Sequence, residues 1–152
     1  MECTGAIEER RSIRKFSRQE IGVELIRELI RYGGLAASGM NVQPIKYIVA
    51  AGESADEIFP HTRWAGYLKG KGSPAFEERP YAFILVLNDN NLRKNGYELD
   101  AGAAVQNILL AAHALGLGTV WLGVHPREER VTGVRKLLGI PDHVVPVALV
   151  AI

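Results

Sequence analysis

The chain has 152 residues, with 18 lysines and arginines against 17 aspartates and glutamates, which gives a formal net charge of +1. This balance is unlike that of a general nucleic-acid binder, which is normally basic across a whole face. Hydrophobic residues make up 47% of the chain and charged residues 23%, values that indicate one folded domain and exclude a disordered chain.

Residues 5–16 predict a short helix that leads into a turn. The next segment, RQEIGVELIRELIRYGG (18–34), places apolar residues four apart from Ile21 to Ile30, which predicts an amphipathic helix ended by Gly33. A loop of small and polar residues then runs to Pro44, and a short strand is expected around 47–50. Residues 52–80 show the least periodicity, with a short helical piece expected near 56–59.

The run YAFILVLND (81–89) is continuously apolar and bounded by turn residues, which predicts a buried strand. A long helix is expected over 97–115, a strand over 119–124, a helix over 126–139 with Pro126 near its start, and a last strand over 144–152. Helices between the later strands indicate a layered core of helices and sheet, whereas the helical start does not fit a doubly wound sheet. No repeat or linker divides the chain, so we expect a single domain over residues 1–152.

Targeting and disulfide signals are lacking in the sequence. The N-terminus, MECTGAIEERR, contains no apolar run, so we expect no secretory signal. The longest apolar stretch, 108–124, is shorter than the roughly 20 residues of a membrane helix and is interrupted by His113 and two glycines. The single cysteine, Cys3, excludes an internal disulfide and fits a reducing compartment. These features predict a soluble cytoplasmic protein that binds neither membranes nor nucleic acid.

Several familiar site motifs are also missing. The four histidines lack metal-ligand spacing, and only one cysteine could join them, so we expect no metal site. The pair Gly116-x-Gly118 lacks the third glycine of a dinucleotide fingerprint and follows a helix instead of opening one. We interpret Glu98 and Asp100, near the start of the long helix, as charges that interact favourably with its dipole.

One stretch of the sequence is strongly basic. Between positions 10 and 18 there is no carboxylate and there are five cations, Arg10, Arg11, Arg14, Lys15 and Arg18. One interpretation is a solvated face balanced by the flanking glutamates. The other is a site for one anionic group such as a phosphate, because alternate residues of an extended segment would aim Arg10, Ser12 and Arg14 to one side. Nucleic-acid binding is the weaker alternative, since only Phe16 is available nearby for stacking.

Four segments of the chain, in order, resemble the nitroreductase family of flavin-dependent enzymes. These are RRSIRKF (10–16), AASGMNVQPIKYIV (36–49), DAGAAVQNILLAAHALGLGTVWLGV (100–124) and KLLGIPDHVVPVALVAI (136–152). The resemblance implies an α+β fold, a three-layer α/β/α sandwich with a central mixed sheet, in a homodimer that carries FMN at the subunit interface. It also implies hydride transfer from NAD(P)H to an organic acceptor, such as a nitroaromatic or quinone, by a ping-pong mechanism. A flavin-binding or sensing protein with little turnover is the alternative.

The resemblance assigns roles to the basic segment. Arg10 and Ser12 are expected to bind the phosphate of FMN, with Arg11 close to the ribityl chain. Arg14 is expected beside the N1 and O2 edge of the ring, where reduced flavin accumulates negative charge. Lys15 and Arg18 are then left as solvated cations.

Two further sets of residues are implied. Leu122, Gly123 and Val124 are expected to lie against the flavin, with the Gly123 N–H facing N5 and no side chain in between. The loop that contacts the same FMN from the partner subunit is expected to contain Ser38, Gly39, Met40, Asn41 and Gln43. No catalytic side chain is implied, because the cofactor carries the redox chemistry.

The sequence also departs from the family pattern. Ala37 stands where many members have proline, and the chain ends at Ile152, where members usually continue with a tail that brings a basic residue to the phosphate. We therefore expect phosphate binding to depend more on the N-terminal arginines. The sequence shows no clear equivalent of the family's mid-chain contact to the pyrimidine edge of the flavin, for which Arg63, Trp64 and Lys69 are candidates.

Overall fold

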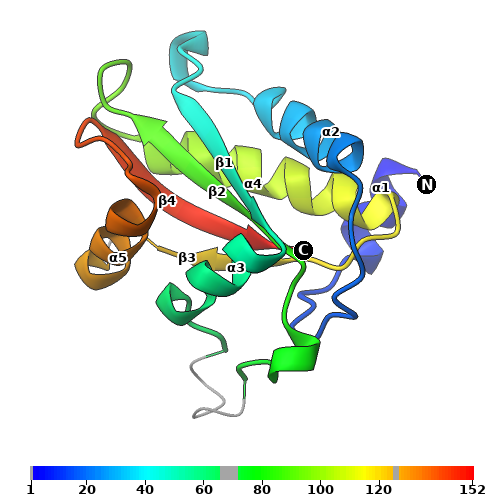
Figure 1. The fold of residues 1–152 in the computed structure, drawn as a ribbon. Coiled ribbons are helices and arrows are strands. Elements are labelled where there is room, and N and C mark those ends of the chain that lie inside the picture. The colour runs from blue at the N-terminus through cyan, green and yellow to red at the C-terminus, as the bar shows by residue number, and fades with distance from the viewer. Residues whose placement is uncertain (1, 66–71, 125–126) are drawn as a thin grey trace.

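A four-stranded sheet lies at the centre of the computed structural model, which describes residues 2–65, 72–124 and 127–152 (Figure 1). Its strands follow the order β1 (Ile45–Ala51), β2 (Ala82–Asp89), β4 (Val144–Ala151) and β3 (Val120–Gly123), and all three neighbouring pairs are antiparallel. The predicted buried strand is β2, which is central, and every side chain from Ala82 to Leu87 is buried. β3 lies at one edge of the sheet.

Helices cover both faces of the sheet (Figure 1). On one side lie α1 (Cys3–Glu9), α2 (Val23–Gly34) and α4 (Tyr97–Ala114), and on the other lie α3 (Glu53–Ile58) and α5 (Glu128–Leu138). Three 3-10 turns complete the described elements: η1 (Gly39–Asn41), η2 (Phe59–His61) and η4 (Phe76–Glu78). The predicted three-layer α+β architecture is confirmed.

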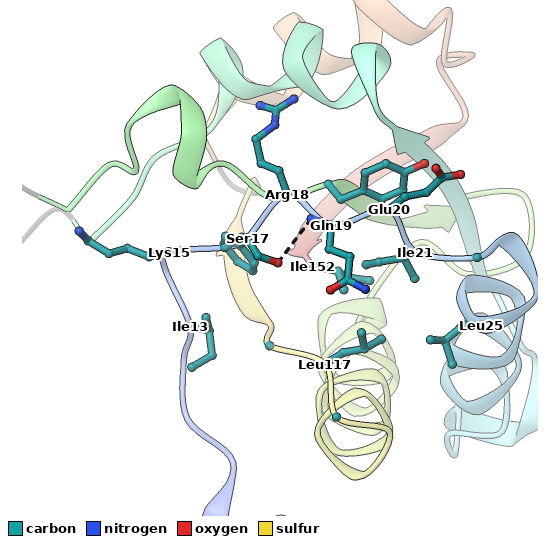
Figure 2. A pocket seen from close by; sticks show the side chains of 15 residues that line it. Ile13, Lys15, Ser17, Arg18, Gln19, Glu20, Ile21, Leu25, Leu117 and Ile152 are labelled. Carbon is teal, nitrogen blue, oxygen red and sulfur yellow. Dashed lines mark hydrogen bonds between the residues drawn. The ribbon is translucent and has the colours of Figure 1, made fainter.

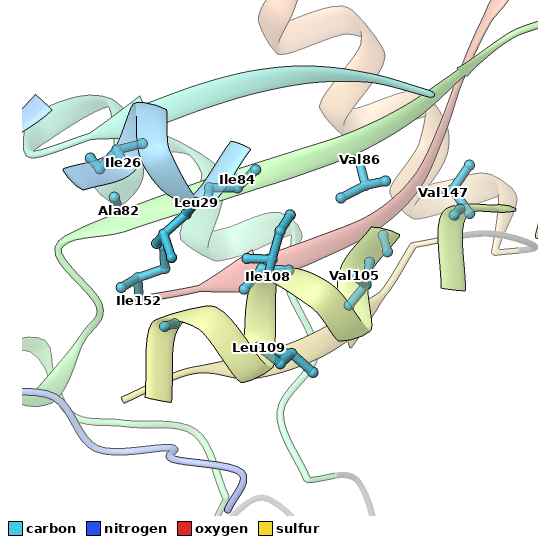
Figure 3. Packing of buried hydrophobic residues seen from close by; sticks show 14 of the residues in the cluster. Ile26, Leu29, Ala82, Ile84, Val86, Val105, Ile108, Leu109, Val147 and Ile152 are labelled. Carbon is cyan, nitrogen blue, oxygen red and sulfur yellow. The ribbon is translucent and has the colours of Figure 1, made fainter. Parts of the chain in front are cut away.

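The two faces of the sheet form two apolar cores. Because successive strand side chains point to opposite faces, Ile84 and Val86 pack with α2 and α4, whereas Phe83 and Leu85 pack on the side of α3 and α5. Figure 3 shows the first core, in which Leu29 of α2 and Ile108 of α4 meet β2. These cores fix α4 and β3, the two elements that border the candidate site.

The N-terminal segment differs from the helix expected over 5–16. The helix α1 ends at Glu9, and Arg10 already has an extended backbone, with φ −55° and ψ 134°. From there the backbone bonds sideways to other segments: the Ile13 N–H donates to the Thr119 carbonyl at 2.9 Å and the Phe16 N–H to the Glu78 carbonyl at 2.9 Å. Long-range hydrogen bonds have replaced helical ones, which local periodicity does not reveal.

The remaining boundaries agree closely with expectation. Helix α2 begins at Val23, after Ile21, and α4 ends one residue before the predicted end. The resemblance implied a mixed sheet, but the only parallel pairing among the described residues is the single bridge between Ser12 and Thr119. Pro126 and Lys69 lie outside the described residues. None of the described helices has the length and apolar character that a membrane crossing requires.

Candidate functional site

The basic segment is held along the outer edge of β3. Ser12 forms a parallel bridge with Thr119, and the Ile13 side chain packs against Gly118, where an added β-carbon would lie 3.0 Å from its Cγ2. Gly118 therefore has a packing reason, because it allows the segment to approach the sheet closely. The extended backbone that the anion-site interpretation requires is thus present in place of the helix expected to run to residue 16, and it is attached to the sheet edge.

The four residues of the basic segment that were predicted to contact the cofactor line two adjacent cavities. Ser12 and Arg14 line a cavity of about 410 Å³ together with Lys15 and residues 72–74. Arg10 and Arg11 line a neighbouring cavity of about 430 Å³, together with Glu9, His113, residues 116–118 and Thr119. Ile13 lines both cavities. The structure thus brings the four predicted residues to one sheet edge, but a ligand that contacts them all must extend across Ile13.

The second cavity contains polar atoms that lack hydrogen-bond partners. His113 Nε2 and Thr119 Oγ1 are both buried, and neither has a partner among the described residues. Arg11 Nη1 donates to the Glu8 carbonyl at 2.7 Å, and neither Arg10 nor Arg11 forms an ion pair with a carboxylate in the described ranges. This cavity therefore offers cationic and polar groups to an anionic, hydrogen-bonding ligand.

The other two cations of the basic stretch are not equivalent. Lys15 is exposed and forms an ion pair with Glu78 at 2.8 Å, in line with a solvated residue. Arg18 was expected to be solvated, and that expectation is wrong. Its guanidinium donates to both carboxylate oxygens of Asp56, at 2.8 and 3.0 Å, and each of the two side chains is 25% exposed. The hydrogen bond from Arg18 is the main reason that the pKa of Asp56 is lowered.

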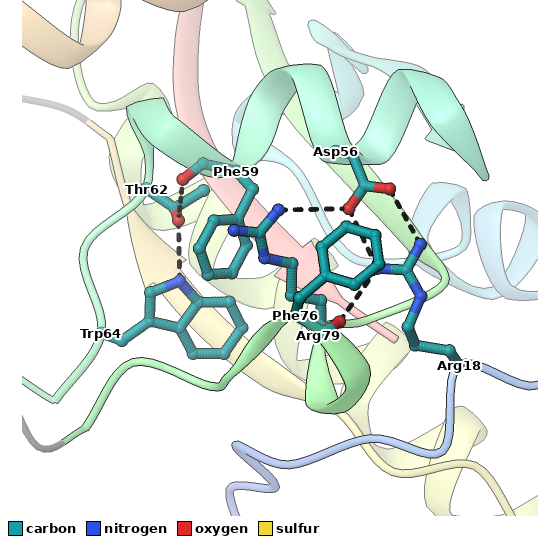
Figure 4. A network of polar contacts seen from close by, with 7 residues as sticks. All are labelled: Arg18, Asp56, Phe59, Thr62, Trp64, Phe76 and Arg79. Carbon is teal, nitrogen blue, oxygen red and sulfur yellow. Dashed lines mark hydrogen bonds and ion pairs between the residues drawn. The ribbon is translucent and has the colours of Figure 1, made fainter.

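Figure 4 shows the wider network around Asp56. Arg79 approaches the same carboxylate at 3.5 Å and lies over the Phe59 ring at 4.0 Å from its centroid, while Arg18 lies over Phe76 at 4.6 Å. Trp64 stacks on Phe59 and donates from Nε1 to Thr62 Oγ1 at 2.7 Å. The candidate role of Trp64 at a flavin edge is therefore disfavoured, because its side chain is only 5% exposed and belongs to the core.

A further cavity, of about 410 Å³, lies beneath residues 15–22 (Figure 2). Its apolar wall includes Ile13, Ile21, Leu25 and Leu117, and the Gln19 N–H donates to Ser17 Oγ on its rim at 3.4 Å. None of the side chains predicted to contact the cofactor lines this space.

The backbone of Gly123 faces the open edge of the sheet. The Val124 N–H donates to the Val147 carbonyl at 3.3 Å, and Gly123 lies opposite Ala148 in the antiparallel register. Because adjacent residues of such a ladder alternate in direction, the N–H and C=O of Gly123 point away from β4. An added β-carbon at Gly123 would meet no atom of the described residues within 4 Å. The side chains of Leu122 and Val124 are buried in the core, and their N–H and C=O point toward β4, so Gly123 alone of the three presents its polar backbone groups at this edge.

The predicted partner-contacting loop is anchored to the start of α4. The Gly39 N–H donates to Asp100 Oδ1 at 3.0 Å, and Arg93 Nη1 donates to the Gly39 carbonyl at 3.2 Å. Arg93 also forms an ion pair with Asp100, at 3.4 Å. A β-carbon added at Gly39 would overlap the Arg93 guanidinium, so a side chain there would displace the end of Arg93 and its contacts with the loop. Asp100 is thus more than the helix-dipole charge expected from the sequence, since it positions this loop.

The same loop has a strained backbone. Three of its non-glycine residues have left-handed conformations, Met40 with φ 52°, Asn41 with φ 54° and Gln43 with φ 53°. Asparagine tolerates this region, whereas methionine and glutamine rarely adopt it. The Gln43 N–H donates to Ser38 Oγ at 2.9 Å, which closes the loop, and Met40 is 91% exposed. Strain of this kind concentrates at functional sites.

The loop and the basic segment do not meet within one chain. The loop contacts Asp100 near the start of α4, whereas Ser12 contacts Thr119 just beyond its end. An α-helix of this length, Tyr97–Ala114, spans about 27 Å at 1.5 Å per residue. Figure 1 shows the two segments at opposite ends of the α2–α4 pair.

Comparisons with known proteins agree with this geometry. The model of the nitroreductase family matches residues 7–152. The chain belongs to the nitroreductase family. It is 38% identical to a protein of Methanothermobacter thermautotrophicus provisionally named NADH dehydrogenase/NAD(P)H nitroreductase, over 99% of this chain and 75% of that one. A protein of Archaeoglobus fulgidus with the same provisional name is also 38% identical, over 99% and 84%.

Solved structures support the assignment to the nitroreductase family. A protein of Parabacteroides distasonis, again provisionally named NADH dehydrogenase/NAD(P)H nitroreductase, superposes with a TM-score of 0.85 at 33% identity, over 98% of this chain and 84% of that one. A provisionally named nitroreductase of Desulfovibrio desulfuricans, solved in complex with FMN, superposes with a TM-score of 0.77 at 33% identity, over 99% and 84%.

Two residues near the edge of β3 were not found from the sequence of this nitroreductase-family chain. Arg130 Nη1 donates to the Gly123 carbonyl at 2.7 Å, and Trp121, 44% exposed, lies beside Gly102 of α4. Trp121 lies between two apolar residues that are buried, Val120 and Leu122, so the alternation of a strand with one exposed face could have indicated that Trp121 is exposed. Nothing local to Arg130 indicated its contact, since its partner lies in another element.

Proposed function

We propose that the protein is an NAD(P)H-dependent FMN oxidoreductase that acts as a homodimer. The names of its archaeal relatives and the FMN complex of the Desulfovibrio desulfuricans protein support this proposal. FMN, when bound, supplies hydride transfer from NAD(P)H to an organic acceptor such as a nitroaromatic or quinone. The two substrates would enter the same cleft one after the other, in a ping-pong mechanism. One observation carries the proposal: the basic segment is hydrogen-bonded along the edge of β3, and the same edge exposes the backbone of Gly123.

The residues at this edge fit a phosphate-bearing cofactor. Arg10 and Ser12 would hold the phosphate, because a guanidinium fork and a hydroxyl match its acceptor oxygens. Arg11 borders the same cavity as Thr119, whose buried Oγ1 lacks a partner among the described residues and suits a hydroxyl of the ribityl chain. These contacts bind and orient the cofactor and take no part in chemistry.

Two residues would act on the ring itself. Arg14, which lines the cavity of Ser12, would place a positive charge beside the pyrimidine edge and so favour the reduced, more negative form. Gly123 would direct its N–H toward N5, since that N–H points outward and no side chain stands before it. Leu122 and Val124 would flank Gly123 and hold it in position through their buried side chains and their pairing with β4.

The separation of the two residue sets supports the homodimer. Because the loop Ser38–Gln43 and the basic segment lie near opposite ends of α4, one FMN would be contacted by the segment of one protomer and the loop of its partner. Met40 is 91% exposed and Leu99, at the start of α4, is 80% exposed. Exposed apolar side chains beside a strained, anchored loop are typical of a surface that a partner covers.

The test is a titration of the purified protein with FMN, followed by anaerobic addition of NADH or NADPH. We expect bound FMN to quench its own fluorescence on binding, the protein to be a dimer by light scattering, and the flavin absorbance to bleach on a catalytic timescale. A protein that shows neither fluorescence quenching nor a thermal shift with FMN would rule out the proposal. Bound flavin that bleaches only very slowly would instead favour the flavin-binding alternative.

A further inference from the structure

Near Gly123 lies a cluster of three arginines, Arg63, Arg127 and Arg130, that the cofactor contacts proposed above do not use. Arg63 was a candidate from the sequence for the pyrimidine edge of the flavin, and we assign it to this cluster instead. Arg130 is partly buried on α5, and its Nη1 reaches the Gly123 carbonyl at 2.7 Å. Arg127 is the residue directly before α5, and Arg63 follows η2. The three cations therefore come from two segments that are far apart in the sequence.

Close packing of α5 on η2 brings these segments together. Gly133 faces His61, whose Nδ1 would lie 2.5 Å from a β-carbon at that position. Only glycine allows this approach, and Arg130 lies on the same helical face, three residues before Gly133. Arg63 lies two positions beyond His61, and its charge acts on Arg130.

The charges of the cluster are not neutralised locally. Burial, then the charge of Arg63, then that of Arg127, lower the pKa of Arg130 below its ordinary value, while Glu129 acts in the opposite direction. No ion pair joins any of the three arginines to a carboxylate within the described parts of the chain. Three cations that repel one another, none of them in an ion pair among the described residues, leave positive charge that an anion would relieve.

We propose that Arg63, Arg127 and Arg130 form a phosphate-binding site that receives the phosphate groups of the nicotinamide nucleotide. This inference rests on the proposed function, in which the Gly123 N–H faces the flavin. The N–H and C=O of Gly123 leave β3 on the same side, and Arg130 donates a hydrogen bond to that C=O. The cluster therefore lies on the side of β3 where the flavin would bind. A nucleotide whose ring lies against the flavin at Gly123 would find the cluster directly beside it. Guanidinium forks match phosphate oxygens, and a positive patch at the cleft also accelerates the encounter with an anionic substrate.

The experiment measures bleaching of FMN-loaded protein by three donors under anaerobic conditions: NADH, NADPH and 1-benzyl-1,4-dihydronicotinamide, which has no phosphate. We expect Arg63→Gln and Arg127→Gln each to raise the Kd of the nucleotides about tenfold, with an unchanged limiting rate and unchanged reaction of the benzyl donor. Neither variant touches Gly123. Lys136→Gln, on the exposed part of the same helix, serves as the matched control and should leave all constants unchanged.

The two sources of phosphate give different results. Equal losses for NADH and NADPH assign the site to their shared diphosphate, whereas a loss confined to NADPH assigns it to the 2′-phosphate. Unchanged nucleotide constants in both variants, or an equal loss with the benzyl donor, would overturn the inference. Failure of all three donors to bleach the flavin would instead count against the proposed function.

A binding measurement judges the site independently of turnover. With FMN present in excess to saturate the cofactor arginines, sodium diphosphate should raise the melting temperature of the wild type and of Lys136→Gln. The same diphosphate should not stabilise the Arg63→Gln/Arg127→Gln double variant. Equal stabilisation of all three proteins would contradict a phosphate site at this cluster.

Discussion

Replacing Asp56 with asparagine removes the carboxylate that Arg18 and Arg79 share. Two hydrogen bonds from Arg18, at 2.8 and 3.0 Å, and the approach of Arg79 at 3.5 Å are weakened together. Hydrogen bonds to charged groups contribute about 1.5–3 kcal/mol when shielded from water, and exposed ion pairs about 0–1 kcal/mol. With side chains 25% exposed, we expect a loss of about 2 kcal/mol, which lowers Tm by about 4–8 °C in a chain of this size.

The pH dependence separates this explanation from loss of packing. The pKa of Asp56 is lowered in the folded state, chiefly by its hydrogen bond from Arg18, so its contribution is complete above the unfolded pKa of about 3.9 and is lost as pH falls through the folded value. Calorimetric Tm values of wild type and Asp56→Asn should therefore differ fully at neutral pH and converge once the pH has fallen through the lowered pKa of the folded state. Glu24→Gln, in an exposed pair with Arg27, is the control and should shift Tm by no more than about 2 °C. An undiminished difference in acid would refute the electrostatic account.

Three further predictions concern the cofactor edge and the core. Arg10→Ala should weaken FMN binding about 10- to 100-fold in a fluorescence titration, because a charge-assisted contact is lost, whereas Arg27→Ala, at an exposed site on α2, should leave the affinity unchanged. Equal small effects of the two variants would favour a basic face that is merely solvated. Gly123→Ala should keep the wild-type Tm, because its methyl group meets nothing within 4 Å, yet should weaken FMN binding; unchanged affinity would exclude close contact at Gly123. Gly33→Ala should lower the free energy of unfolding, measured in urea, by about 1–3 kcal/mol, because its methyl group would come within 2.8 Å of the Tyr47 hydroxyl. Gly34→Ala, whose methyl group meets no described atom within 4 Å, should leave that free energy unchanged or raise it. The reverse order would contradict the packing described.

Helices and strands that show a clear hydrophobic pattern within their own residues could be predicted from the sequence. The continuous apolar run of β2 and the length of α4 reflect burial on both sides, and both elements lie where they were expected. The four-residue spacing of α2 likewise reports one face packed against α4. The extended form of residues 10–14 was foreseen only as one of two interpretations, because it depends on the bridge between Ser12 and Thr119.

Contacts between distant segments could not be predicted. Arg18 was expected in solvent because its partner, Asp56, lies 38 residues away on another helix. The anchoring of Gly39 by Asp100 and the contact of Arg130 with Gly123 depend in the same way on how the layers assemble. Pairings of this kind come from tertiary packing, which leaves no periodic pattern in the sequence.

The central claim, that two protomers share each flavin, is tested by mixing two variants. Arg10→Ala alters the basic segment, and Asn41→Gly alters the loop while accepting its positive φ. Each homodimer should bind FMN weakly. After subunit exchange, half of the dimers should be mixed, and each mixed dimer should have one site with both segments intact, so about a quarter of all sites should regain wild-type affinity in a fluorescence titration. Exchanged mixtures in which no tight-binding fraction returns would contradict a site built from both protomers.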